Sequence, residues 1–300
     1  MRFALALACT LSVTAPAAAQ PGPPSERVTA RAVPLGDGVV RVVSRWGMDS
    51  GSARLTVPHG HAVELYDGMG AATLVAGHDA VLVAYGVDEA RTPFRYRLVR
   101  REGDTVRVGD AVEMHRPGSR RDLPFAVVAT PTEDGFSIFY QEIQEDDPSA
   151  AHTYLLHVGA DGRPAGQAQE VRVPWSLAAA VDNGHGFHLA LIYPGDARGM
   201  RLSMVSFSPA GQPQQHPDWS SRPGMIDDVH LVRNGGTIKV FYRGGDGGDR
   251  LLERDVTRIG SWGHNPPAAR DHGRLRQSQA ILIRMRHDVA VAERVPVRAD

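Results

Sequence analysis

Residues 183–193 of this chain read NGHGFHLALIY, a tight turn followed by a short, mostly apolar run that ends in tyrosine. Asn-Gly turns accept the positive backbone φ angles that two-residue hairpins require. The apolar run is too short for a typical helix and is bounded by glycine and proline, which favours a buried strand. The stretch therefore predicts the turn and second strand of a β-hairpin.

The same pattern of turn, apolar strand and final tyrosine recurs along the chain. The clear copies end at Tyr85, Tyr140, Tyr193 and Tyr242, and these tyrosines are 55, 53 and 49 residues apart. Each copy lies between two further apolar or alternating runs, so a unit of about 50 residues supplies three or four strands. Fainter copies begin at Gly36 and cover residues 280–285.

The composition agrees with a β-rich repeat. The 32 glycines and 21 prolines disfavour long helices and supply many turns. A hydrophobic content of 42% with a net charge of -1 indicates a globular chain and excludes a disordered one. The near-zero charge also argues against a nucleic-acid-binding protein that works by broad neutralisation of phosphates.

Three or four strands in each unit of this length are typical of a β-propeller blade. We therefore predict an all-β protein, a β-propeller of about five to six blades, with residues 20–300 in one domain. A β-sandwich with regularly spaced turns is the alternative. Residues 28–35 are expected to pair near residues 289–297 and so close the ring, which removes exposed sheet edges. The polar segment 261–278 breaks the repeat and is expected to be an irregular insert.

Residues 1–19 have the features of a signal peptide. Arg2 precedes an apolar stretch, and small residues at positions 17–19 fit a cleavage site. The apolar stretch is far short of the roughly 20 residues that a membrane span requires. The only cysteine, Cys9, lies within it, so the mature chain would contain no disulfide; acylation of Cys9 in a lipoprotein is the alternative. We expect a secreted or periplasmic protein without a membrane span.

The repeat resembles secreted bacterial β-propeller proteins over essentially the whole mature chain, although no family-defining motif is present. In such a fold, the loops that enter the first strands and those that join the second and third strands surround the central channel on one face. Acidic residues fall on these loops, and the candidates for catalysis are Asp67, Asp122, Asp227 and Glu142. This layout is similar to that of five-bladed propeller glycosidases, which implies one acid that protonates the leaving oxygen and another that activates water or attacks the sugar.

Other side chains on the same loops are candidates for binding a ligand. Trp175 is suited to stack on a sugar ring, and Arg121 and Arg243 are suited to hold hydroxyl groups or a carboxylate. Trp262, in the segment that breaks the repeat, is a further candidate. The alternative is that these groups cap turns or pack against the blades, and the strand-ending tyrosines are expected to fill the space between blades.

Motifs of serine hydrolases, zinc metalloproteases, P-loop NTPases and dinucleotide-binding enzymes are absent. The pairs His59–His61 and His185–His188 have no further ligands near them in the sequence, so we predict no metal site and no cofactor. The sequence favours a monomeric module that binds a carbohydrate or protein, with no nucleic-acid partner. A glycoside hydrolase is the alternative, and whether the protein is an enzyme stays open.

Overall fold

The computed structural model describes most of the chain beyond its first 26 residues. The described residues are 27–46, 51–67, 70–77, 79–87, 93–114, 122–144, 151–173, 175–194, 199–220, 226–234, 236–245, 249–256, 268–276, 279–286 and 289–296. All of them are in strands, turns or short connections, so this part of the chain is all-β. It contains no helix that is long and apolar enough to cross a membrane.

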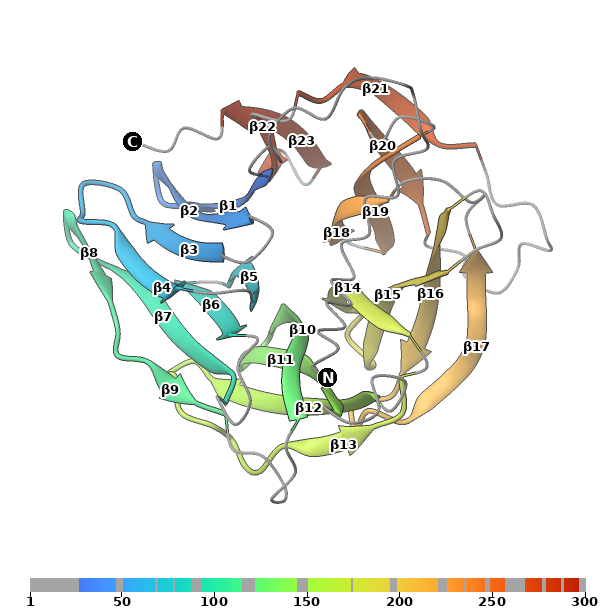
Figure 1. Ribbon diagram of the computed structural model, residues 1–300, viewed down its shortest axis with the longest axis horizontal. Helices are drawn as coiled ribbons and strands as arrows, with labels where there is room; N and C mark the ends of the chain where they lie inside the picture. The colour runs from blue at the N-terminus through green and yellow to red at the C-terminus, as the bar shows by residue number, and fades with distance from the viewer. Residues whose placement is uncertain are drawn as a thin grey trace, which may run out of the picture.

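The strands form five sheets around a central axis, which makes the molecule a five-bladed β-propeller (Figure 1). Blade one contains β1 (Arg27–Leu35), β2 (Gly38–Trp46), β3 (Gly51–Thr56) and β4 (Val63–Asp67). Blade two contains β5 (Gly70–Ala76), β6 (Ala80–Val87), β7 (Arg95–Glu102) and β8 (Thr105–Val108), with β9 (Val112–Glu113) paired to β7. Blade three contains β10 (Asp122–Thr132), β11 (Gly135–Gln144), β12 (Ala151–Gly159) and β13 (Gln169–Val171).

Blades four and five have the same four-stranded order. Blade four contains β14 (Ser176–Asp182), β15 (Phe187–Pro194), β16 (Met200–Phe207) and β17 (Pro213–Ser220). Blade five contains β18 (Asp227–Asn234), β19 (Thr237–Gly244), β20 (Arg250–Asp255) and β21 (Arg270–Arg274). A final hairpin, β22 (Gln279–Arg286) and β23 (Val289–Pro296), joins the sheet of blade one. The polar segment 261–278 is therefore not irregular throughout, because β21 lies within it.

The first strand of each blade lies nearest the axis, where β1, β5, β10, β14 and β18 follow one another (Figure 1). Consecutive strands within a blade are antiparallel, so a first strand begins at the same end at which the second strand finishes and the third begins. We call this end of the propeller the entry face. It is the end at which the sequence places the candidate side chains.

The hydrophobic core lies between neighbouring blades, where the facing sheets bury alternate side chains. Tyr140 of blade three is fully buried, stacks on Tyr154 with ring centroids 5.2 Å apart, and contacts Phe94 of blade two at 5.4 Å. Tyr85 and Tyr242 are buried in equivalent places. These tyrosines fill the space between blades, as the sequence predicts, whereas the tyrosine of blade four has another environment that is described below.

The ring is closed by the parallel pairing of β1 with β22, in which Ala32 lies opposite Leu282. The predicted pairing of residues 28–35 with residues 289–297 is therefore wrong, because β23 lies on the far side of β22 and pairs only with it in this sheet. The physical reason is burial. Ile281 and Leu282 of β22 are fully buried, and Ile281 packs in a cluster with Phe241 of blade five.

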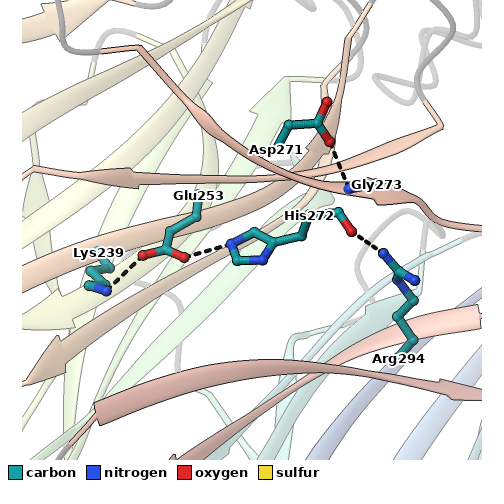
Figure 2. A network of polar contacts seen from close by, with 6 residues as sticks. All are labelled: Lys239, Glu253, Asp271, His272, Gly273 and Arg294. Atoms are coloured by element: carbon teal, nitrogen blue, oxygen red, sulfur yellow. Dashed lines mark hydrogen bonds and ion pairs between the residues drawn. The ribbon is translucent and has the colours of Figure 1, made fainter.

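A polar network fastens the closing hairpin to blade five (Figure 2). Glu253 on β20 accepts hydrogen bonds from Lys239 Nζ at 2.7 Å and from His272 Nε2 at 2.6 Å, and Arg294 of β23 donates to the His272 carbonyl. Burial raises the pKa of Glu253, but the hydrogen bonds from Lys239 and His272 outweigh this effect and hold the pKa below its usual range. The network links β19, β20, β21 and β23.

Candidate functional site

The first strands of three consecutive blades are irregular near the entry face. Their pairing with the second strand shifts between Pro124 and Ala126 in β10, between Leu177 and Ala179 in β14, and between Asp227 and His230 in β18. A shift of this kind interrupts the alternation of side chains and turns one residue in a new direction. In each of these blades it occurs at the mouth of the central channel.

The irregularity in blade five holds Asp228 in an unusual backbone conformation. Its φ is +49°, in the left-handed region that non-glycine residues rarely adopt. Its Oδ1 accepts a hydrogen bond from His230 Nε2 at 2.9 Å, and the two side chains are only 14% and 16% exposed. The backbone strain persists because the side chain of Asp228 is held by these surroundings.

Two arginines complete this polar cluster. Burial raises the pKa of Asp228, but the charges of His230, Arg31 and Arg243 outweigh this effect and keep it below its ordinary value. Arg31 of β1 donates to Thr73 Oγ1 on β5 at 3.2 Å, and Arg243 of β19 donates to a carbonyl of β22 at 2.7 Å. A carboxylate with a lowered pKa carries no proton at neutral pH, so Asp228 is not suited to act as a general acid. The cluster instead ties blade five to blade one and to the closing hairpin.

A pocket of about 410 Å³ opens at the entry face between blades three and four. Trp175, which immediately precedes β14, forms part of its wall and stacks on Tyr193 with ring centroids 4.3 Å apart and planes 19° apart. This contact fixes the orientation of the indole. The remaining lining residues belong to β12, β13 and the segment after β13, and they are Ala151, Thr153, Glu170, Val171, Arg172 and Val173.

The pocket combines apolar walls with a few polar groups. Glu170 is bonded to His152 Nδ1 at 2.7 Å, and its side chain is 60% exposed. Arg172 is also exposed, and it forms no ion pair with any other residue that the structure describes. A carboxylate acceptor, a guanidinium donor and a fixed aromatic ring around an apolar floor are the groups that recognise a ligand with hydroxyl groups and apolar faces.

The four acids proposed for catalysis are spread over several blades. Asp67 is exposed on β4, the fourth strand of blade one, whereas Glu142 is only 1% exposed on β11 of blade three. The sheet of blade two lies between these strands (Figure 1). Asp122 and Asp227 are the first residues of β10 and β18, and their side chains lie outside the described part of the structure.

The candidates for ligand binding also occupy separate places. Arg243 lies in the Asp228 cluster, and Trp175 lies at the pocket. Arg121 and Trp262 lie outside the described residues, as do residues 1–19 of the expected signal peptide. Among the residues that the structure describes, no group of three or more histidine, cysteine or acidic side chains is placed to hold a metal ion.

Sequence reasoning missed most of the polar groups that the fold brings together. Asp228 was visible as the neighbour of Asp227, but its contacts with His230 and the two arginines depend on an irregular stretch of β18. Nothing in the sequence indicated that Arg31, on the first strand of a faint copy of the repeat, would lie in this cluster. Glu170 and Arg172 lie on or after β13, a strand of three residues that has no clear pattern in the sequence.

Comparisons with known proteins indicate the fold. No family model matches the chain, and no curated protein matches it significantly. Among solved structures, it is similar to a xylan beta-1,4-xylosidase from Bacillus halodurans, with 12% identity, a TM-score of 0.50, and coverage of 75% of this chain and 49% of that one. A Trypanosoma rangeli sialidase in complex with sialic acid has 10% identity and a TM-score of 0.53, over 91% of this chain and 52% of that one.

A third structure is similar over most of its own length. It is the subtype N10 neuraminidase-like protein of A/little yellow-shouldered bat, with 10% identity and a TM-score of 0.50, over 87% of this chain and 89% of that one. The chain spans about half the length of the xylosidase and of the sialidase. At these identities the likeness concerns the propeller architecture alone.

Proposed function

We propose that this protein is a carbohydrate-binding β-propeller, secreted or periplasmic, whose ligand occupies the pocket beside Trp175. One observation carries the proposal: an indole fixed by stacking on Tyr193 forms a wall of a pocket of about 410 Å³ that also presents Glu170 and Arg172. A volume of this size is suited to a small number of sugar units. Residues 1–19 support export of the chain.

The groups in the pocket match the chemistry of a sugar. The C–H faces of a pyranose or furanose ring pack on an aromatic ring, and its hydroxyl groups both donate and accept hydrogen bonds. Glu170 accepts, and Arg172 donates. Because the two side chains carry opposite charges, the pocket favours an uncharged sugar over an acidic one.

Binding without hydrolysis is the simpler function for this pocket. Glycoside hydrolysis generally uses two carboxyl groups about 5 to 10 Å apart on either side of the scissile bond. Glu170 supplies the one carboxylate among the described residues that line the pocket. A glycoside hydrolase that uses Asp67, Asp122, Asp227 or Glu142 stays the alternative, and it would act at another place on the molecule.

The test is a binding screen of the mature protein against neutral xylo-, arabino-, cello- and galacto-oligosaccharides, followed by calorimetry. We expect binding that Trp175→Ala weakens by more than about tenfold, because the substitution removes the aromatic surface. Arg172→Ala should also weaken binding. Arg163→Ala is the matched control, because Arg163 is exposed in a turn at the opposite end of blade three.

Two results would contradict the proposal. One is that the wild-type protein binds none of these oligosaccharides. The other is that Trp175→Ala binds them as tightly as the wild type does. Release of reducing sugar from the same oligosaccharides, abolished by Asp122→Ala, would instead support the glycoside hydrolase.

A further inference from the structure

A buried amide lies directly behind the wall of the pocket. Gln141 of β11 is only 1% exposed, and its Nε2 donates both to the Trp175 carbonyl and to Thr153 Oγ1, each at 3.2 Å. A carbonyl oxygen can only accept a hydrogen bond, so the nitrogen of the amide must face Trp175. This contact fixes the orientation of the whole amide group.

The oxygen of this amide has no hydrogen-bond donor. Gln141 Oε1 is buried and has no partner among the described residues. Leaving a buried acceptor unsatisfied costs about 1 to 3 kcal/mol. An apolar side chain of similar volume would avoid this cost, but it would leave the Trp175 carbonyl and Thr153 Oγ1 without the amide donor, so the net contribution of Gln141 to stability is small.

The amide determines what Thr153 offers to the pocket. Thr153 Oγ1 accepts the hydrogen bond from Gln141, so the proton of its own hydroxyl group must point elsewhere. No described residue accepts that proton, and Thr153, which is only 2% exposed, lines the pocket. The hydroxyl is thus held as a hydrogen-bond donor to whatever occupies the pocket.

We infer that Gln141 is a positioning residue that acts through Thr153. Thr153 in turn determines specificity, because it donates a hydrogen bond to an acceptor oxygen of the bound sugar. Gln141 acts in two ways: it holds the backbone of Trp175 in place, and it directs the Thr153 proton into the pocket. The inference rests on the proposed function, because it assumes that a carbohydrate occupies this pocket. An uncharged sugar has hydroxyl and ring oxygens that can accept the Thr153 proton.

The test uses calorimetry with xylotetraose, arabinotetraose, cellotetraose and galactotetraose. Thr153→Val, which is nearly isosteric but has no hydroxyl, should weaken binding roughly tenfold, the equivalent of one hydrogen bond. Thr153→Ser, which keeps the donor, should bind within about twofold of the wild type. Gln141→Met should weaken binding to a similar extent and change the melting temperature little, because removal of the unsatisfied oxygen offsets the loss of two hydrogen bonds.

A double variant separates positioning from simple structural support. If Gln141 acts through Thr153, the losses of affinity from Gln141→Met and Thr153→Val should be less than additive when combined. The inference is overturned if Thr153→Val binds like the wild type, or if Gln141→Met lowers the melting temperature and leaves the affinity unchanged. Loss of binding in Trp175→Ala with no effect of Thr153→Val would leave the proposed function standing without the inference. Failure of the wild type to bind any of the four sugars would overturn both.

Discussion

At the scale of single residues, blade four contains a histidine that the fold keeps neutral, at the end opposite the entry face. Asn183 Oδ1 accepts from the backbone amide of His185, so the Asn183 amide nitrogen faces His188 Nε2 at 3.1 Å. His188 Nδ1 therefore carries the proton and donates to Ser206 Oγ at 2.8 Å. Burial lowers the pKa of His188 from its ordinary 6.5. Protonation would break the hydrogen bond from Asn183.

The lowered pKa of His188 predicts a loss of stability on mild acidification. The unfolded chain takes up a proton near pH 6.5, while the folded chain resists it, so stability is complete above that pH and falls as the pH drops toward the folded-state pKa. Burial also lowers the pKa of His157, which contributes with the same sign. We expect His188→Gln to reduce the slope of unfolding free energy against pH below about 6.5.

His185→Gln is the matched control for this measurement, because His185 is exposed in the adjacent turn. Chemical denaturation at a series of pH values measures the slope for each variant. Equal slopes for His188→Gln and the wild type would show that His188 does not titrate as its burial implies.

At the scale of strands, the sequence predicted the first three strands of the repeated units and missed their fourth strands. The second strands are largely apolar, because both of their faces are covered by neighbouring blades, and each continues past its repeated tyrosine. The fourth strands are edges with weak patterns: β8 has four residues and β13 has three. The pocket is built largely from β13 and the residues that follow it, so of its wall only Trp175 was predictable.

The pairing shifts set a second limit on prediction from sequence. A shift reverses which side chains face the channel, and nothing in the local sequence marks where it occurs. Asp228 lies beside Arg31 and Arg243, next to the shift between Asp227 and His230. Glu142 shows a related limit, since its expected loop position suggested exposure, whereas it lies within β11 and is only 1% exposed.

The strands of blade five depend on a buried carboxylate. Glu253 is 9% exposed and bonds to Lys239 and His272 (Figure 2). Glu253→Gln should lower the free energy of unfolding by about 3 kcal/mol, because it leaves Lys239 without its counter-charge in a mostly buried site. Glu102→Gln is the control, since the exposed pair of Glu102 with Arg107 should contribute less than about 1 kcal/mol. Equal effects in urea denaturation would contradict this account of the network.

At the scale of the whole molecule, the repeat predicted the architecture but not the closure. A regular unit with three visible strands is enough to indicate a propeller, because each blade buries its faces against the next. Both terminal strands are largely apolar and each carries two charged residues, so their sequences do not show which of them pairs with β1. The pairing of β22 with β1 becomes clear only when blade five is seen to cover Ile281.

The parallel closure can be tested by an engineered disulfide. In Ala32→Cys/Leu282→Cys the two cysteines would be direct partners of β1 and β22, and the mature chain would contain no other cysteine. We expect this pair to oxidise, as measured by mass spectrometry and by altered mobility on a non-reducing gel. Ala32→Cys/Ala292→Cys should stay reduced, because β23 does not pair with β1. Oxidation of the second pair instead of the first would contradict the closure.

The central claim is that a sugar binds beside Trp175 at the entry face. A crystal structure of the protein with the tightest-binding oligosaccharide of the screen tests it most directly. The account predicts a sugar ring packed on the indole of Trp175, with hydroxyl groups within hydrogen-bonding distance of Glu170 and Arg172. A sugar bound in the central channel beside Asp228, with the pocket empty, would contradict it.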